Sequence, residues 1–165
     1  AAKDAKMRAL KDAISAALVN FEGNGLTVEQ RDGKVYVSME NKLLFDSGSW
    51  AVNSRGKEAV VQLGRVSADN PEIAVLIEGH TDNVPYGGSG NIKDNWDLST
   101  KRATAIVNII ISNSRIPEEN LTAAGRGEYA PVASNSSPEG RSKNRRIEVI
   151  LTPKLDEIAK LLEEI

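Results

Sequence analysis

The chain has no cysteine and only one histidine, His80, among its 165 residues. The lack of cysteine excludes disulfides, thiolate metal ligands and a cysteine nucleophile, and one histidine cannot build a multi-histidine metal cage. No apolar run approaches the roughly 18 residues that cross a bilayer, and the first residues lack the apolar core of a secretory signal. We therefore expect membrane anchoring only through segments upstream of Ala1, if these are present.

Charge of one sign is not in excess, since 21 basic residues face 23 acidic ones and the net charge is -2. A basic cluster of Arg141, Lys143, Arg145 and Arg146 stands out, but no aromatic residue is interleaved for base stacking. We therefore expect no nucleic-acid partner. The hydrophobic content of 40% and the chain length fit one globular domain that buries roughly two-thirds of its unfolded surface.

Residues 1–42 predict a helix and a β-hairpin that precede the main domain. Apolar residues recur at three- and four-residue spacing from Asp4 to about Phe21, which indicates an amphipathic helix. Asp32-Gly33 then separates two alternating runs, residues 26–30 and 35–39, and this is a strong hairpin signal. The helix is expected to pack on the domain, although pairing with a second copy leaves a homodimer open.

Residues 43–152 predict the order strand, helix, strand, helix, strand, strand. Asn53 or Ser54 begins the first helix, and the strand from Ile73 to Glu78 should be buried on both faces because its apolar run is nearly continuous. The second helix runs from about Asn95 to Ser112. The fold class is therefore α/β (α+β), a two-layer sandwich of a mixed β-sheet with helices on one face.

Three further segments complete the predicted order. Residues 135–143 form a polar loop, and residues 146–151 form the last strand because apolar and polar side chains alternate there. Thr152 and Pro153 then serve as N-cap and first helical residue of a closing helix over residues 153–165.

Gly79-His80-Thr81-Asp82-Asn83 closes the buried strand, and Arg102 follows Asp82 by twenty positions, near the start of the next helix. A carboxylate can hold an ammonium group while a guanidinium fork holds a carboxylate. The two side chains together suit a ligand with both charges, such as the end of an amino acid. They could instead form a structural ion pair with each other. A lone histidine beside them favours packing or hydrogen bonding over a metal site.

Five sequence strings occur in order along the main domain. They are Phe45-Asp46-Ser47-Gly48-Ser49, Glu78-Gly79-His80-Thr81-Asp82, Asn95-Trp96-Asp97-Leu98-Ser99-Thr100-Lys101-Arg102-Ala103, Gly125-Arg126-Gly127-Glu128 and Glu139-Gly140-Arg141-Ser142-Lys143-Asn144-Arg145-Arg146. Together they resemble the OmpA-like C-terminal domain family, the peptidoglycan-binding module also found in Pal lipoproteins and flagellar MotB. The resemblance covers about Leu43 to Leu151.

The resemblance implies a groove that holds the peptide stem of peptidoglycan through meso-diaminopimelate. Asp82 would receive the ammonium group of this residue and Arg102 its carboxylate. Free backbone N–H groups in the first helical turn, such as those of Leu98 and Ser99, would also favour an anion. The flanking groove positions that match by motif are Asp46, Thr81 and Asn95, and Arg145 or Arg146 matches the basic pair that braces Asp82 or the loops.

The resemblance further implies a non-enzymatic, periplasmic tether at the outer membrane, without cofactor or metal, whose partner is the peptidoglycan stem peptide. An alternative is a cell-wall hydrolase, but Ser47 and Ser99 lack the strand-to-helix elbow of a serine nucleophile. Another is a flagellar stator fragment, because the loop from Asn83 to Asp94 is longer than in OmpA or Pal and looks more like that of MotB.

Overall fold

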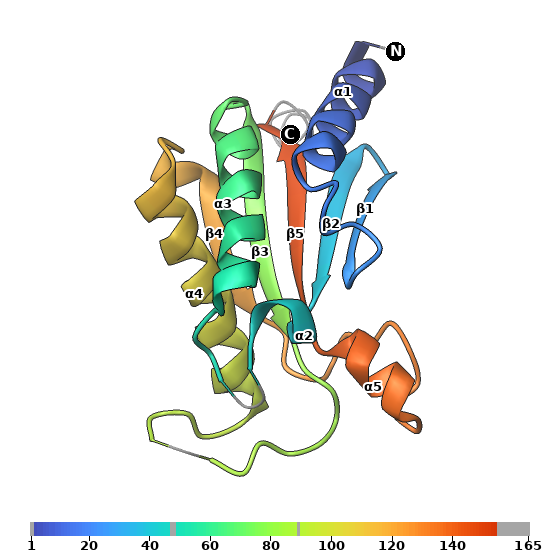
Figure 1. The fold of residues 1–165 in the computed structure, drawn as a ribbon, viewed down its shortest axis with the longest axis vertical. Coiled ribbons are helices and arrows are strands. Elements are labelled where there is room, and N and C mark those ends of the chain that lie inside the picture. Colours follow the sequence, from blue (N-terminus) through green and yellow to red (C-terminus); the bar gives the residue numbers. More distant parts are fainter. Residues whose placement is uncertain (1, 47–48, 89, 155–165) are drawn as a thin grey trace, which may run out of the picture.

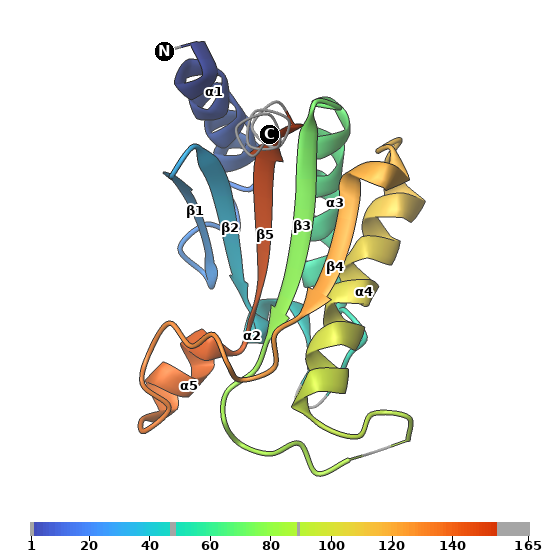
Figure 2. The ribbon, with the colours of Figure 1, turned by 180° about the vertical axis from the view of Figure 1, so that it is seen from behind.

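The computed structural model describes residues 2–46, 49–88 and 90–154. Five strands form one mixed sheet in the order β1-β2-β5-β3-β4, and the long helices cover one face of it (Figures 1 and 2). The elements are α1 (Ala2–Ala17), β1 (Leu26–Arg31), β2 (Lys34–Glu40), α2 (Asn41–Leu44), α3 (Ser54–Ala68), β3 (Ile73–His80), α4 (Asn95–Asn113), the 3₁₀ turn η1 (Glu118–Asn120), β4 (Leu121–Gly125), α5 (Pro138–Asn144) and β5 (Arg146–Pro153). The predicted fold class is confirmed.

The N-terminal hairpin is continuous with the main sheet. Asp32 and Gly33 both have positive φ angles, 52° and 74°, as the tight turn between two right-twisted strands requires. Strand β2 then pairs antiparallel with β5, from Val35 opposite Leu151 to Glu40 opposite Arg146. Strand β3 lies between β5 and β4, antiparallel to the first and parallel to the second.

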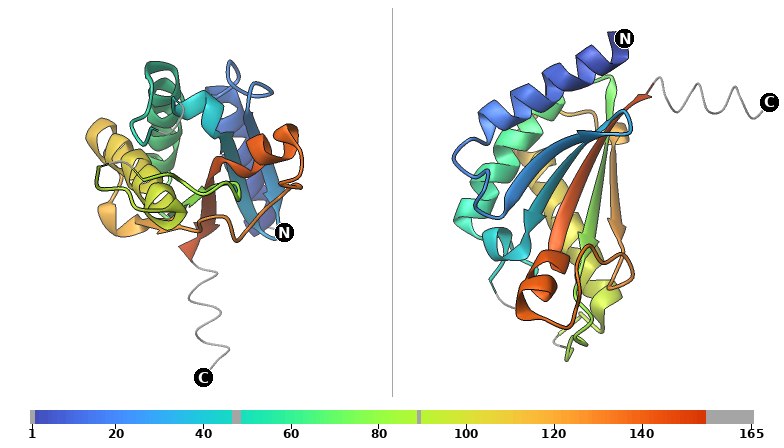
Figure 3. Two further views of the ribbon diagram at one scale, coloured as in Figure 1. Left: turned by 90° about the horizontal axis from the view of Figure 1, so that it is seen from below. Right: turned by 90° about the vertical axis from the view of Figure 1, so that its right-hand side faces the viewer.

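One face of the sheet carries the hydrophobic core. In β3, Val75 and Ile77 are buried under the helices, whereas Ala74, Leu76 and Glu78 point to the other face and are only half-buried. The prediction that this strand is buried on both faces was therefore wrong. The helices lie on one side of the sheet only (Figure 3), so an apolar run does not guarantee a second covering layer.

The three long helices pack as their sequence patterns predict. Helix α1 lies against β1, β2 and α3, and its apolar side chains Met7, Leu10 and Ile14 are buried. Asn53 is the N-cap of helix α3, and its side chain accepts a hydrogen bond of 2.8 Å from the backbone N–H of Gly56. Among the described residues, no helix is both long enough and apolar enough to cross a bilayer.

Two predicted segments differ from the structure. The strand expected from Leu43 is instead the short helix α2, whose residues Leu43 and Leu44 are buried beside α3, and β2 takes the place of that strand in the sheet. The polar loop expected over residues 135–143 contains helix α5. Ser137 caps it by accepting a hydrogen bond from the N–H of Gly140, and Pro138 occupies the first turn.

The predicted helix start at Thr152 and Pro153 was also wrong. Both residues continue β5 and pair with Ala74 and Ile73 of β3. The strand extends to Pro153 because the backbone of β3 is still available for pairing at Ala74 and Ile73. Lys154 is helical, and residues 155–165 of the predicted closing helix lie outside the described residues.

Gly79 sets the distance between β3 and the first turns of α4. A methyl group added at Gly79 would overlap the backbone carbonyl of Ser99. We expect Gly79→Ala to lower the free energy of unfolding by about 1–3 kcal/mol, measured by urea denaturation, because the backbone of α4 must move away. Gly87→Ala is the matched control, since nothing lies within 4 Å of its added methyl group. An equal loss in both variants would contradict the role of this close approach.

Candidate ligand-binding site

A cavity of about 320 Å³ lies at the end of β3, between the first turns of α4 and helix α5. The residues that line it come from the end of β3 and the following loop, from the first turns of α4 and from α5. They are Thr81, Asp82, Val84, Pro85, Tyr86, Gly87, Asn95, Leu98, Arg102, Arg141 and Arg145. The structure therefore brings together six of the eight site residues expected from sequence. The exceptions are Asp46 and Arg146.

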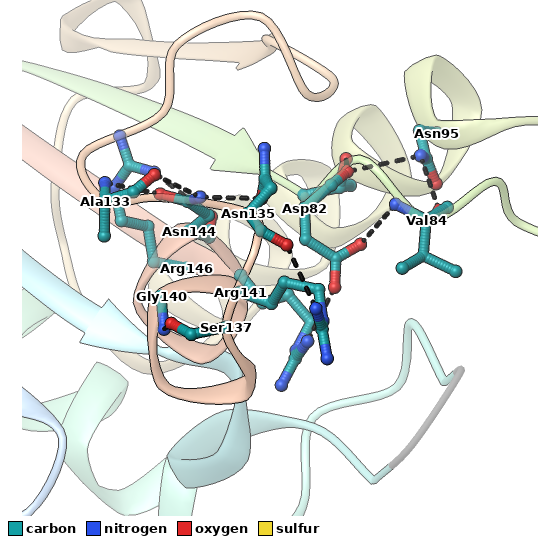
Figure 4. Close-up of polar contacts among 12 residues, drawn as sticks. Asp82, Val84, Asn95, Ala133, Asn135, Ser137, Gly140, Arg141, Asn144 and Arg146 are labelled. Atoms are coloured by element: carbon teal, nitrogen blue, oxygen red, sulfur yellow. Dashed lines mark hydrogen bonds and ion pairs between the residues drawn. The ribbon is translucent and has the colours of Figure 1, made fainter.

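Asp82 is held by two contacts inside this cavity. Its Oδ2 atom forms an ion pair of 2.6 Å with Nη1 of Arg145, and its Oδ1 atom accepts a hydrogen bond of 3.0 Å from the N–H of Val84 (Figure 4). Of the two candidate bracing residues, Arg145 is thus the one that touches Asp82. The alternative of an ion pair between Asp82 and Arg102 does not occur.

Arg102 is a buried cation without a carboxylate partner among the described residues. It is 5% exposed, its Nε donates a hydrogen bond of 2.8 Å to the carbonyl of Ser49, and its guanidinium lies 4.9 Å from the ring centre of Phe45. Burial lowers the pKa of Arg102 to about 10; repulsion from Arg145 acts in the same direction, while Tyr86 and Asp82 oppose the shift less strongly than burial causes it. Since a buried charge is costly unless it is paired, this guanidinium is a ready position for an anion.

The polar residues beside Asp82 shape the loop that borders the cavity. The hydroxyl of Thr81 donates to the carbonyl of Asp82 at 2.8 Å. The side-chain amide of Asn95 donates to the carbonyl of Val84 at 3.0 Å and lies 3.5 Å from that of Asp82. The contacts of Asn95 tie the start of the loop to α4.

The first turn of α4 offers fewer free donors than expected. The N–H of Leu98 already donates to the carbonyl of Asp94 at 3.0 Å, and the side chain of Asp94 accepts from the N–H of Asp97. The prediction that the Leu98 N–H is free for a ligand was therefore wrong. Leu98 lines the cavity with its side chain, and Arg102 rather than the helix end carries the positive charge.

Asp46 and Arg146 lie elsewhere. Asp46 is exposed and lines a different cavity, together with Lys42, Asn53 and Arg55. Arg146 is buried at the start of β5, where its guanidinium bonds the carbonyl of Ala130 and the carboxylate of Glu148. The motif strings place these residues correctly along the chain, but they do not show toward which cavity a side chain points.

Sequence reasoning missed Arg141 and Tyr86 as residues of the cavity. Arg141 was noticed in a basic cluster and in the fifth sequence string, but no place in the site was assigned to it, because its segment was expected to be a loop. The dipeptide Ser137-Pro138 is a helix-start signal that could have found α5. Tyr86 stands in a glycine-rich loop, and no sequence pattern indicates its direction.

His80 belongs to a compact polar cluster on the face of the sheet that the helices leave uncovered. Its Nε2 atom lies 3.2 Å from Glu78 and 3.5 Å from Glu148, and the ligand atoms of these three residues lie within 4.8 Å of one another. Arg146 already bonds Glu148 at 3.0 Å, and Nδ1 of His80 has no acceptor among the described residues. Because Nε2 is engaged by Glu78 and the carboxylate of Glu148 by Arg146, the geometry favours internal pairing of this cluster. The expectation that His80 is a hydrogen-bonding residue is confirmed.

The loop between β4 and α5 is held by four hydrogen bonds of one buried side chain, Asn144, in addition to the bond from Arg146 to Ala130. Its Oδ1 accepts hydrogen bonds from the N–H groups of Val132 and Ala133 at 2.8 and 3.0 Å, and its Nδ2 donates to the carbonyl of Ala133 and to Asn135 at 2.9 and 2.8 Å (Figure 4). Because Asn144 ends α5 and precedes Arg145, these bonds also position the partner of Asp82.

Asn144→Ala should lower the free energy of unfolding by about 3 kcal/mol, because two loop N–H groups lose their acceptor. Thermal or urea unfolding measures this change. Asn108→Ala, at an exposed position of α4, is the control and should be neutral or slightly stabilising. A small effect of both substitutions would show that the loop does not depend on Asn144.

Glu78 should contribute to stability in a pH-dependent way. The hydrogen bond to His80 is the main cause that lowers its pKa from the ordinary value of 4.5. A carboxyl whose pKa is lowered by folding stabilises the protein above its unfolded pKa, and this contribution is lost as the pH falls through the folded value. We expect Glu78→Gln to be less stable by about 1 kcal/mol at neutral pH in urea titrations.

The deficit of Glu78→Gln should begin to shrink below pH 4.5, where the unfolded carboxyl becomes neutral, and disappear as the pH falls through the lower pKa of the folded carboxyl. Glu29→Gln, at an exposed position of β1, serves as the control. A deficit that is the same at neutral and at acidic pH would contradict the assignment of the effect to charge.

Comparison with known proteins agrees with this fold. The chain is 36% identical over 118 residues to Motility protein B of Bacillus subtilis, which covers 72% of this chain and 45% of that protein. It is 32% identical over 123 residues to the Outer-membrane lipoprotein YfiB of Pseudomonas aeruginosa, covering 74% of this chain and 70% of the lipoprotein. The chain thus spans about half the length of Motility protein B and a larger share of YfiB.

A solved structure described as the cell wall anchor of the T6SS from Pseudomonas aeruginosa superimposes with a TM-score of 0.74. It is 26% identical, and the match covers 85% of this chain and 96% of that one. None of these three relatives is described as an enzyme. The model of the OmpA family matches residues 44–145, which include Asp82, Arg102 and the whole lining of the cavity. The chain belongs to the OmpA family.

Proposed function

We propose that this domain binds the stem peptide of peptidoglycan non-covalently and tethers a component of the cell envelope to the cell wall from the periplasmic side. The observation that carries the proposal is the buried guanidinium of Arg102, which faces the same cavity as Asp82 but has no carboxylate partner among the described residues. A ligand carboxylate would supply the missing partner.

The ligand group that fits best is the amino-acid end of meso-diaminopimelate. Its carboxylate would pair with Arg102, and its ammonium group would share the carboxylate of Asp82 with Arg145. A carboxylate has about four lone-pair positions, and Asp82 uses two of them for Arg145 and the N–H of Val84. Room for an ammonium donor therefore remains, and the existing contacts keep the carboxylate in a fixed orientation.

The related proteins support a tether rather than a catalyst. One is described as a cell wall anchor and another as an outer-membrane lipoprotein, and both descriptions refer to the cell envelope. Within the described part of the chain, the cavity contains neither a serine nor a histidine, and its single carboxylate is engaged by Arg145. The alternative of a cell-wall hydrolase therefore has no serine–histidine pair in this cavity.

The same tethering function would also suit a fragment of a flagellar stator. The relative described as Motility protein B is 36% identical, and the loop after Asp82 is long. In that case the tethered component would be a flagellar motor, whereas in the lipoprotein case it would be the outer membrane. The site and its ligand would be the same in both.

Titration of a soluble diaminopimelate-containing muropeptide into the purified domain tests the proposal. We expect saturable binding by calorimetry, and a loss of about 2–5 kcal/mol of binding free energy in Asp82→Asn and in Arg102→Gln, because each removes one partner of a buried charge pair. Lys143→Gln, an exposed change on α5 outside the cavity, is the matched control.

Unchanged affinity in Asp82→Asn and Arg102→Gln would exclude the roles proposed for these residues. Release of soluble fragments from purified peptidoglycan during incubation with the domain would instead favour the hydrolase alternative.

A further inference from the structure

The cavity at the end of β3 carries more positive charge than an amino-acid end requires. Three guanidinium groups line it, those of Arg102, Arg141 and Arg145, but only one carboxylate does, that of Asp82. Asp82 is paired with Arg145. Among the described residues, Arg102 and Arg141 therefore both lack an ion-pair partner within the cavity.

Arg141 is held in place without being neutralised. Its Nη1 donates a hydrogen bond of 3.0 Å to the backbone carbonyl of Asn135, and its other donors have no acceptor among the described residues. Arg141 belongs to α5 and lines the same cavity as Asp82. A backbone carbonyl fixes the direction of the guanidinium but leaves its charge and most of its five donors available.

The two unpaired arginines differ in depth. Arg102 is 5% exposed at the base of α4, whereas Arg141 is half-buried on α5. Repulsion from Arg145 is one of the causes that lower the pKa of Arg102, which shows that the cations of this cavity act on one another. A ligand with a single carboxylate would pair with one of the two unpaired arginines and leave the other uncompensated.

We propose that Arg141 forms a second carboxylate subsite, so that the ligand of this cavity must carry a carboxylate in addition to its amino-acid end. This inference rests on the proposed function and defines its ligand more narrowly. In a stem peptide, the γ-linked glutamyl residue beside diaminopimelate has such a group, because the γ-linkage leaves its α-carboxylate free. The domain thus prefers stem peptides in which this carboxylate is free over those in which it is amidated.

The test compares two tripeptides, L-alanyl-γ-D-glutamyl-meso-diaminopimelate and the same peptide with an amidated glutamyl α-carboxyl group. Calorimetry should show that the wild-type domain binds the free acid about tenfold more tightly, the loss expected when one charge-assisted contact is removed. Arg141→Gln should bind both peptides alike, with the affinity that the wild type has for the amide. Arg141→Lys keeps the charge and should keep a preference for the acid.

Lys143→Gln, also on α5 but outside the cavity, is the control and should retain the full preference. A purely structural role of Arg141 would weaken the binding of both peptides equally and leave their ratio unchanged, which would overturn the proposal. Equal binding of acid and amide by the wild type would overturn it too, while the proposed function would stand. If neither tripeptide bound to the wild type, the proposed function would fail and the subsite with it.

Discussion

The close approach of β3 to α4 determines the geometry of the whole cavity. At this point Gly79 lies against the backbone of Ser99, and Gly125 of the neighbouring strand lies against Thr100. Side chains at these two positions would push the helix away from the sheet. Because Asp82 follows Gly79 by three residues and Arg102 follows Ser99 by three, the contact between the two backbones fixes the separation of the two charged groups.

Charged side chains are paired within the protein on one side of this contact and left partly unpaired on the other. On the uncovered face of the sheet, Glu78 and Glu148 are directly opposite each other, as are His80 and Arg146. The attractions run along each strand, from His80 to Glu78 and from Arg146 to Glu148, and diagonally from His80 to Glu148. Charges there satisfy one another within the protein. In the cavity, by contrast, three arginines face Asp82 alone, so the protein leaves positive charge for a ligand to neutralise.

Most of the fold follows from short-range patterns in the sequence. Asp32-Gly33 predicts the hairpin, Asn53 predicts the start of α3, and apolar periodicity predicts α4 from about Asn95 to Ser112, all as the structure has them. These patterns succeed because each depends on backbone conformation or on one helical face, both of which are local properties.

The errors come from long-range context. A strand was expected from Leu43 because the preceding hairpin was treated as separate, whereas β2 itself pairs with β5 more than a hundred residues away. Burial of β3 on both faces was inferred from composition, but the number of layers depends on where the helices pack. The directions of Asp46 and Arg141 depend in the same way on packing that no single motif contains.

The pairing of Asp82 with Arg145 limits how tightly a single site can bind. An ammonium group that approaches Asp82 meets a carboxylate already neutralised at 2.6 Å, so the attraction is weaker than toward a free carboxylate. The ion pair also holds Asp82 in place before a ligand arrives, which reduces the entropy lost on binding. A site of this kind suits an attachment that is modest at each contact, since many such domains along a polymeric cell wall would still hold the envelope firmly through multivalency.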